Sequence, residues 1–257
     1  MVIYVTLRRG FLGGEMNREG IFEGLGQLRK SFLWVIGVVV LMGALLYPFS
    51  RTLLRHLKAS LHEDLIAFAI PEAFLSLLKL TLYASVFFSI PVIFYQLWRS
   101  FSPWFRMKGL KLPLPILLTS IFLFYLGAFF CYFVTLPFGI QFLLGYQSAH
   151  IKPMISAGKY ISFCTAFVFA FGIIFELPLI LAVLSYVRLV TAAFLTRNRR
   201  YAILLIAILS AVLTPTPDFF NMALMGGPLY ILFEVGVLLV KMIERKRMGA
   251  DGSLRGR

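Results

Sequence analysis

Six long runs of apolar residues dominate the chain, and the polar segments between them carry most of the lysines and arginines. A stretch of about 20 predominantly apolar residues is long enough to cross a bilayer as an α-helix. The pattern therefore predicts an all-α integral membrane protein with six spans. The expected spans are residues 31–49, 77–97, 112–136, 160–187, 201–213 and 219–240.

The last two expected spans are short. Residues 201–213 give a helix of about 20 Å, whereas the hydrocarbon core of a bilayer is about 30 Å thick. The sixth span contains Gly226, Gly227 and Pro228, and we expect these residues to interrupt it. Helices 5 and 6 are therefore predicted to be shorter than the other four.

Positive charge is divided unequally between the two sets of loops. If the N-terminus is cytoplasmic, 19 of the 25 lysines and arginines lie on the cytoplasmic side and five on the outer side. Cytoplasmic loops collect lysine and arginine, so this orientation is favoured, with both termini in the cytoplasm. The formal net charge of +14 then reflects topology for the most part, and no nucleic-acid partner is needed to explain it.

Three regions follow from this pattern. Residues 1–30 are expected to form a cytoplasmic N-terminal segment, in which residues 1–15 look unlike the rest and suggest a true start at Met16. Residues 31–241 are expected to form the six-helix membrane domain, and residues 242–257 a basic cytoplasmic tail.

Two outer loops are long enough to cover the bundle. Residues 50–76 contain leucines spaced three and four apart, which predicts an amphipathic helix along the membrane face. The second loop, residues 137–159, is similar in length. We expect the two loops to cap the outer side.

The composition agrees with a membrane protein and argues against an enzyme. Hydrophobic residues make up 60% of the chain and charged residues 14%, with a mean hydropathy of +0.88, whereas soluble proteins are about 25% charged. The sequence has no Gly-x-Ser-x-Gly, His-Glu-x-x-His or phosphate-loop motif, and its three histidines are scattered. We expect no catalysis, no metal site and no cofactor. Cys131 and Cys164 can form a bond, but core packing is favoured.

Two acids fall inside the expected spans. A charged group at membrane depth costs at least about 2.5–3.5 kcal/mol, so it usually faces a partner or a cavity. For Glu234 we expect a hydroxyl or backbone donor within the bundle. For Glu176 we favour a functional role. Pro178 follows it and should kink the helix, and a kinked helix with an acid inside the membrane is expected to line a pocket or to contact a partner.

Small and polar residues gather around the fifth and sixth spans, at Thr214, Asn221, Gly226 and Gly227. Such residues let helices approach closely and hydrogen-bond across a membrane interface. Two interpretations of these four residues are favoured about equally: docking of a partner helix, and packing within the protein itself.

Eight stretches, taken together, resemble the TatC family, the polytopic core of the Sec-independent twin-arginine protein translocase. They follow the family's order and spacing over about residues 25–246. The stretches are "LRK" at 28–30, "PEAFLSLLKL" at 71–80, "IPVIFYQLWRSFSP" at 90–103, "FLFYLGAFFCYFVTLP" at 122–137, "YISFCTAFVFAFGIIFELPLIL" at 160–181, "RRYAIL" at 199–204, "LTPTPD" at 213–218 and "GPLYILFEVGV" at 227–237.

The resemblance implies a cup-shaped receptor in the bacterial inner membrane. Such a receptor binds the twin-arginine signal peptides of folded precursors and assembles, within membrane lipid, with single-span TatA/TatB-type partners into an oligomeric complex driven by the proton-motive force. It implies no hydrolytic chemistry. By position, the cup and partner-docking residues are Glu176, Thr214, Asp218 and Asn221.

The chain departs from the family where signal peptides bind. By position, the site comprises Glu23, Gln27, Arg29, Ser100 and Gly109, and two glutamates of the family pattern are replaced by Gln27 and Gly109. A guanidinium pairs best with carboxylates, so their loss weakens the expected recognition of an arginine pair. A stripe of Glu15, Glu19, Glu23 and Gln27, spaced by four, compensates only if that segment is helical. The glycines at positions 20, 24 and 26 weaken such a helix, and a solvated charged face is favoured.

Three alternatives stay open at this point. The leading hypothesis is a TatC-family translocase subunit. The alternatives to it are a TatC paralogue with restricted or lost twin-arginine recognition, a six-span subunit of a small-solute transporter, and a structural membrane scaffold. A transporter needs a polar lumen, and two buried acids provide too little polarity for one, which argues against the transporter alternative.

Overall fold

Helices make up almost all of the chain that the structure describes. The computed structural model describes residues 18–58, 65–106, 113–145, 155–213 and 219–255. The elements are α2 (Arg18–Leu46), η1 (Tyr47–Phe49), α3 (Ser50–Lys58), β1 (Leu65–Ile66), α4 (Ile70–Arg106), α5 (Pro113–Phe130), a π-helical turn η2 (Cys131–Thr135), α6 (Leu136–Leu144), β2 (Ile155–Ser156), α7 (Ala157–Phe175), α8 (Leu177–Tyr186), α9 (Ala192–Arg197), α10 (Arg199–Leu213) and α11 (Phe219–Arg255).

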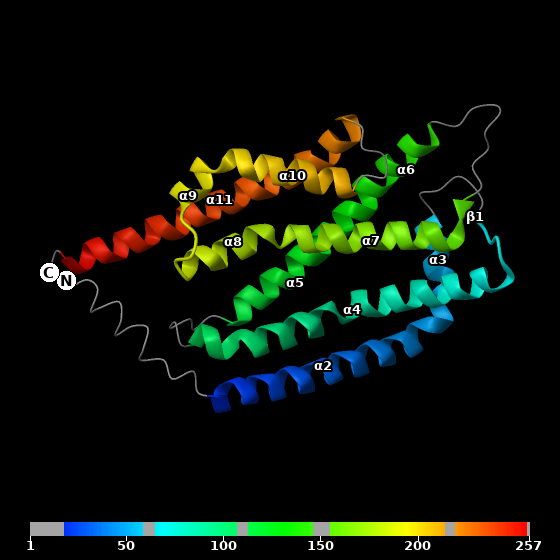
Figure 1. The fold of residues 1–257 in the computed structure, drawn as a ribbon, viewed down its shortest axis with the longest axis horizontal. Coiled ribbons are helices and arrows are strands. Elements are labelled where there is room, and N and C mark those ends of the chain that lie inside the picture. The colour runs from blue at the N-terminus through cyan, green and yellow to red at the C-terminus, as the bar shows by residue number, and fades with distance from the viewer. Residues whose placement is uncertain (1–17, 59–64, 107–112, 146–154, 214–218, 256–257) are drawn as a thin grey trace.

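The long helices lie roughly side by side. The start of α2 and the ends of α4, α8 and α11 lie at one end of the molecule, whereas α3 and β1 lie at the other (Figure 1). By length and composition, five helical segments of the described chain are suited to cross a membrane: Ser31–Lys58, Pro71–Arg99, Leu114–Gln141, Ala157–Tyr186 and Met225–Arg247.

The expected fifth span corresponds to α10. It has 15 residues, which give a length of about 22 Å. A helix of this length is shorter than the hydrocarbon core of a typical bilayer, as the apolar pattern of residues 201–213 predicts.

The expected interruption of the sixth span is wrong. Helix α11 continues for 37 residues with Pro228 inside it, so the sixth helix is longer than predicted. Close packing against neighbours accounts for the continuity: a Cβ on Gly226 would lie 3.2 Å from Ser210 Oγ in α10, and one on Gly236 would lie 2.7 Å from Leu181 Cδ1 in α8. Contacts of this kind, made only by small residues, hold a proline-containing membrane helix in place.

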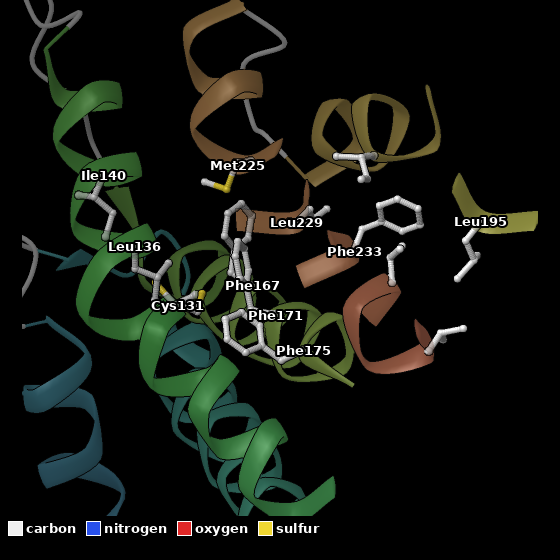
Figure 2. Close-up of a cluster of buried hydrophobic side chains, with 14 of the residues drawn as sticks. Cys131, Leu136, Ile140, Phe167, Phe171, Phe175, Leu195, Met225, Leu229 and Phe233 are labelled. Atoms are coloured by element: carbon white, nitrogen blue, oxygen red, sulfur yellow. The ribbon is translucent and has the colours of Figure 1, made fainter. Parts of the chain in front are cut away.

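The core joins three parts of the bundle. Figure 2 shows three phenylalanines of α7 between side chains of the α5–α6 segment and side chains of α11. Both cysteines are buried as free thiols, so the prediction that they pack in the core is confirmed. The labelled residues of this cluster are Cys131, Leu136, Ile140, Phe167, Phe171, Phe175, Leu195, Met225, Leu229 and Phe233.

Helices α5 and α7 cross closely where each has a glycine. A Cβ on Gly127 would lie 2.6 Å from the carbonyl oxygen of Phe171, and one on Gly172 would lie 2.5 Å from a ring carbon of Phe124. Real Cβ atoms do not approach backbone this closely, so the two helices would have to separate to accept a larger residue.

Gly127→Ala is therefore expected to lower thermal stability. Forcing a methyl group into a packed site costs about 1–3 kcal/mol, which exceeds the gain of up to about 1 kcal/mol for alanine in a helix. The matched control is Gly139→Ala in α6, where a Cβ would meet nothing within 4 Å. Thermal unfolding of the purified proteins in detergent should show a lower Tm for Gly127→Ala alone; equal Tm values would contradict the close crossing.

The end of the molecule that carries α3 is capped by polar contacts. The amphipathic helix predicted within residues 50–76 forms only over α3, since residues 65–66 form β1 and α4 begins at Ile70. The C-terminal carbonyls of α3 accept hydrogen bonds from two tyrosines, Tyr132 to His56 at 2.8 Å and Tyr160 to Leu57 at 2.9 Å. Strand β1 pairs in parallel with β2, which joins the segments on either side of α4 through α6. The Glu72 carboxylate adds bonds from Phe68 N at 2.6 Å and Ser156 Oγ at 2.5 Å.

Candidate functional site

Glu176 sits at a break between two helices. Helix α7 ends at Phe175, α8 begins at Leu177, and Pro178 lies in the first turn of α8. The structure thus has an irregular helix at the position where the sequence predicts a kink. The side chain is 8% exposed, and Ser120 Oγ of α5 donates a hydrogen bond to its Oε2 at 2.9 Å.

The second oxygen of this carboxyl group remains available. Within the described residues, Glu176 Oε1 is buried and has no hydrogen-bond partner. A buried acceptor without a partner costs about 1–3 kcal/mol, and an acid at membrane depth is expensive in itself. Glu176 therefore keeps an unsatisfied acceptor inside the bundle, at the break between α7 and α8. Ser120 carried no signal in the sequence, because serines are common in membrane helices.

A second candidate site lies between α10 and α11. A cavity of about 400 Å³ separates them and contains the buried hydroxyl group of Ser210, which has no partner in the described part of the chain. The residue is fully buried, and its hydroxyl group faces Gly226 of α11, where a Cβ would lie 3.2 Å from Ser210 Oγ. The cavity is lined by Ile203, Ile206, Ala207, Ser210, Met222, Ala223, Gly226, Gly227 and Tyr230.

The polar patch predicted around this pair of helices is only partly described. Asn221 lies in the first turn of α11, whereas Thr214 and Asp218 lie outside the described residues. The sequence missed Ser210, whose signal was its position opposite Gly226 in two helices joined by a short turn.

The positions matched to the signal-peptide site fall on two neighbouring helices. Glu23, Gln27 and Arg29 lie in α2, and Ser100 lies in α4; Gly109 lies outside the described residues. Helix α2 runs beside α4 (Figure 1). Its glycines do not break it, so the part of the acidic stripe from Glu19 to Gln27 is helical, whereas Glu15 lies outside the described residues.

A hydrogen bond connects these two helices close to the matched positions. Ser31 Oγ of α2 donates to Gln96 Oε1 of α4 at 3.2 Å. Ser31 follows Arg29 by two residues, and Gln96 precedes Ser100 by four. The structure therefore brings the backbone at residues 27–29 and at residue 100 to the same end of adjacent helices.

Glu234 has partners inside the protein. Tyr230 donates to its Oε1 at 2.9 Å, and Arg199 Nη2 of α10 donates to its Oε2 at 2.9 Å. The expected hydroxyl donor is confirmed, and the arginine is a partner that the sequence analysis missed. The Arg199–Glu234 bond connects the start of α10 to α11. We therefore interpret Glu234 as a residue that holds these two helices together.

The comparisons with known proteins agree with one another. The family model described as Sec-independent protein translocase protein (TatC) matches residues 23–228. A protein of that name from Desulforapulum autotrophicum is 36% identical over 244 residues, covering 91% of this chain and 88% of its own. Another from Carboxydothermus hydrogenoformans is 33% identical over 235 residues, covering 90% of this chain and 96% of its own.

A solved structure has the same fold over most of its length. A crystal structure of the twin arginine translocase receptor TatC in DDM superposes with a TM-score of 0.71 at 32% sequence identity. The superposition covers 84% of this chain and 99% of that one. With a family model that matches most of its length and relatives more than 30% identical, this chain belongs to the TatC family of Sec-independent protein translocase proteins.

Proposed function

We propose that this chain is the receptor core of a twin-arginine translocase, and that it binds signal peptides at one end and single-span TatA/TatB-type partners along its flank. The likeness to the solved twin-arginine translocase receptor supports the first activity, and the unpartnered hydroxyl group of Ser210 in the α10–α11 cavity supports the second.

The membrane setting follows from the family and the helices. A TatC-family chain with five long apolar helices is a multi-pass protein of the bacterial inner membrane and a component of protein transport. We propose that α10 also crosses the membrane, as the fifth of six spans, that the bilayer thins beside it, and that both termini face the cytoplasm. Helix α10 is then the shortest of the membrane-crossing helices in a cup-shaped bundle.

The proposed signal-peptide site comprises Glu23, Gln27, Arg29, Ser100 and Gly109. Its support is the adjacency of α2 and α4, held by the Ser31–Gln96 hydrogen bond. With neutral residues at 27 and 109, the remaining acid of this set is Glu23. A paralogue with restricted twin-arginine recognition is therefore the second candidate function.

The proposed partner site comprises Ser210 of α10 and Asn221 of α11, with Thr214 and Asp218, which lie between the two helices in sequence and outside the described residues. A helix that enters the cavity can give Ser210 the hydrogen bond it lacks and pack against Gly226 and Gly227. Glu176 is proposed to accept a hydrogen bond inside the cup. The transporter and scaffold alternatives have no support of this kind.

Ser210→Leu is expected to reduce assembly with a single-span partner, because the larger side chain fills the cavity and removes the hydroxyl group. Disulfide or photochemical crosslinking of α10 to a TatA/TatB-type protein in membranes measures the effect, which we expect to be about tenfold. Ser210→Ala removes the hydroxyl group alone and should lower crosslinking by a smaller factor.

The matched control is Ser89→Ala in α4, because Ser89 is also buried with a hydroxyl group that has no partner among the described residues. Ser89→Ala should leave crosslinking unchanged. Normal crosslinking by both Ser210 variants would place the docking site elsewhere.

A further inference from the structure

The segment from α8 to α10 carries positive charge only. Residues 177–213 contain four arginines and no acid. The segment turns at α9, beside the C-terminal half of α11, at the end of the molecule opposite α3 (Figure 1). Charge and fold together place a basic surface at the end of the molecule where the apolar helices α8 and α10 meet α9; one of its four arginines, Arg199, is paired with Glu234.

Helix α9 has one packed side and one exposed side. Ala192 and Leu195 are 7% and 8% exposed in the core, whereas Phe194 is 53% exposed and Leu189, in the preceding turn, is 60% exposed. Arg197 at the end of α9 is also exposed. Exposed apolar residues interleaved with arginine are typical of a segment that lies in the headgroup region of a bilayer.

Two acids of the described part of α11 that lie near this surface make internal contacts. Glu244 Oε1 of α11 accepts a hydrogen bond from Ala192 N at 3.0 Å, and Glu234 is paired with Arg199. The same stretch of α11 supports the turn through Arg247, whose Nη2 donates to the Tyr186 carbonyl at 3.2 Å. These contacts fix the α8–α9 turn without neutralising its exposed arginines.

Three arginines remain exposed on this surface, Arg188, Arg197 and Arg200. The Arg200 guanidinium lies 4.9 Å from the ring centroid of Tyr201, and its Nη2 donates to the Tyr201 hydroxyl at 3.2 Å. An arginine over a tyrosine at the end of an apolar helix is a common arrangement at a membrane interface.

We propose that Arg188, Leu189, Phe194, Arg197 and Arg200, the α9 surface, bind the phosphate headgroup of an anionic phospholipid. The arginines would contact the phosphate, while Leu189 and Phe194 enter the boundary between headgroups and acyl chains. A membrane lipid is the favoured ligand over a free phosphate, because its acyl chains also cover the exposed apolar side chains, and over an acidic peptide, because the surface lies at the ends of the apolar helices α8 and α10. The α9 surface shares no residue with the sites proposed for signal peptides and partner helices.

The test compares lipid binding to the full chain by native mass spectrometry. Purified protein is titrated with phosphatidylglycerol and with phosphatidylcholine of identical acyl chains. Each arginine near an anionic membrane surface strengthens the binding of a protein to that surface by about fivefold. We expect the wild type to prefer phosphatidylglycerol by at least about tenfold, and the variant Arg188→Gln/Arg197→Gln/Arg200→Gln to lose that preference.

Two further variants keep the test specific. The corresponding triple lysine variant retains the charge and should retain the preference, which separates lipid binding from a folding defect. Arg51→Gln/Arg55→Gln changes two exposed arginines of α3 at the opposite end and should leave the preference intact. Equal loss in this control, or no loss in the triple glutamine variant, would overturn the proposal.

A photoreactive residue in place of Phe194 identifies the ligand in native membranes. Crosslinks to phospholipid would agree with the proposal. Crosslinks to a protein instead of lipid would contradict it, since the surface would then be a protein interface.

Discussion

Replacing Glu176 by alanine is expected to lower export of a twin-arginine precursor by at least about tenfold while leaving the protein inserted and stable. The carboxyl group is buried at a helix break, and its Oε1 has no partner within the described chain. Alanine removes an acceptor that a bound molecule can use, and this loss is comparable to one hydrogen bond to a charged group. Export assays in vesicles measure the effect.

Stability separates a functional Glu176 from a structural one. An acid at membrane depth is costly, so its removal should not destabilise the fold unless the Ser120 hydrogen bond outweighs that cost. Ser120→Ala is the matched control: it removes the internal donor, keeps the carboxyl group and should leave export largely intact. Full export by Glu176→Ala would remove this residue from the mechanism.

Restoring the two missing carboxylates is expected to strengthen signal-peptide binding. Gln27→Glu with Gly109→Glu gives an arginine pair the bidentate, charge-assisted partners that the chain lacks. A hydrogen bond to a charged group contributes about 1.5–3 kcal/mol, so binding should tighten by about tenfold or more. Titration of a labelled twin-arginine signal peptide against the purified protein measures the change.

Charge specificity is the control for this gain. A twin-lysine peptide should gain less, because a lysine cannot form the bidentate pair. Equal affinity of the double variant and the wild type for the twin-arginine peptide would mean that recognition lies outside residues 27 and 109.

The helices were predictable to different degrees for identifiable reasons. Apolar run length predicted the long helices and the short α10, since 15 residues give a helix shorter than the hydrocarbon core of a typical bilayer, whatever they contact. Local propensity failed at Gly226, Gly227 and Pro228, because the contacts of α11 with α8 and α10 outweigh the helix-breaking tendency.

The contacts at the candidate sites could not be predicted from the sequence, because they join residues that are far apart in the chain. The hydrogen bonds Ser31–Gln96 and Ser120–Glu176 join residues 65 and 56 positions apart. A single sequence gives the apolar period of each helix but not which serine of one helix meets which acid or amide of another. Ser210 and Arg199 were missed for the same reason, whereas Glu176 stood out because an acid in an apolar run carries its own cost.

The most direct test of the receptor proposal is site-specific photocrosslinking in inner-membrane vesicles, with probes at residues 27 and 109 and a labelled twin-arginine precursor. We expect crosslinks from both positions that are lost when the arginine pair of the precursor is changed to lysine. Absence of crosslinks from a correctly inserted protein would contradict the receptor role and favour a paralogue that has kept the TatC fold without general signal recognition.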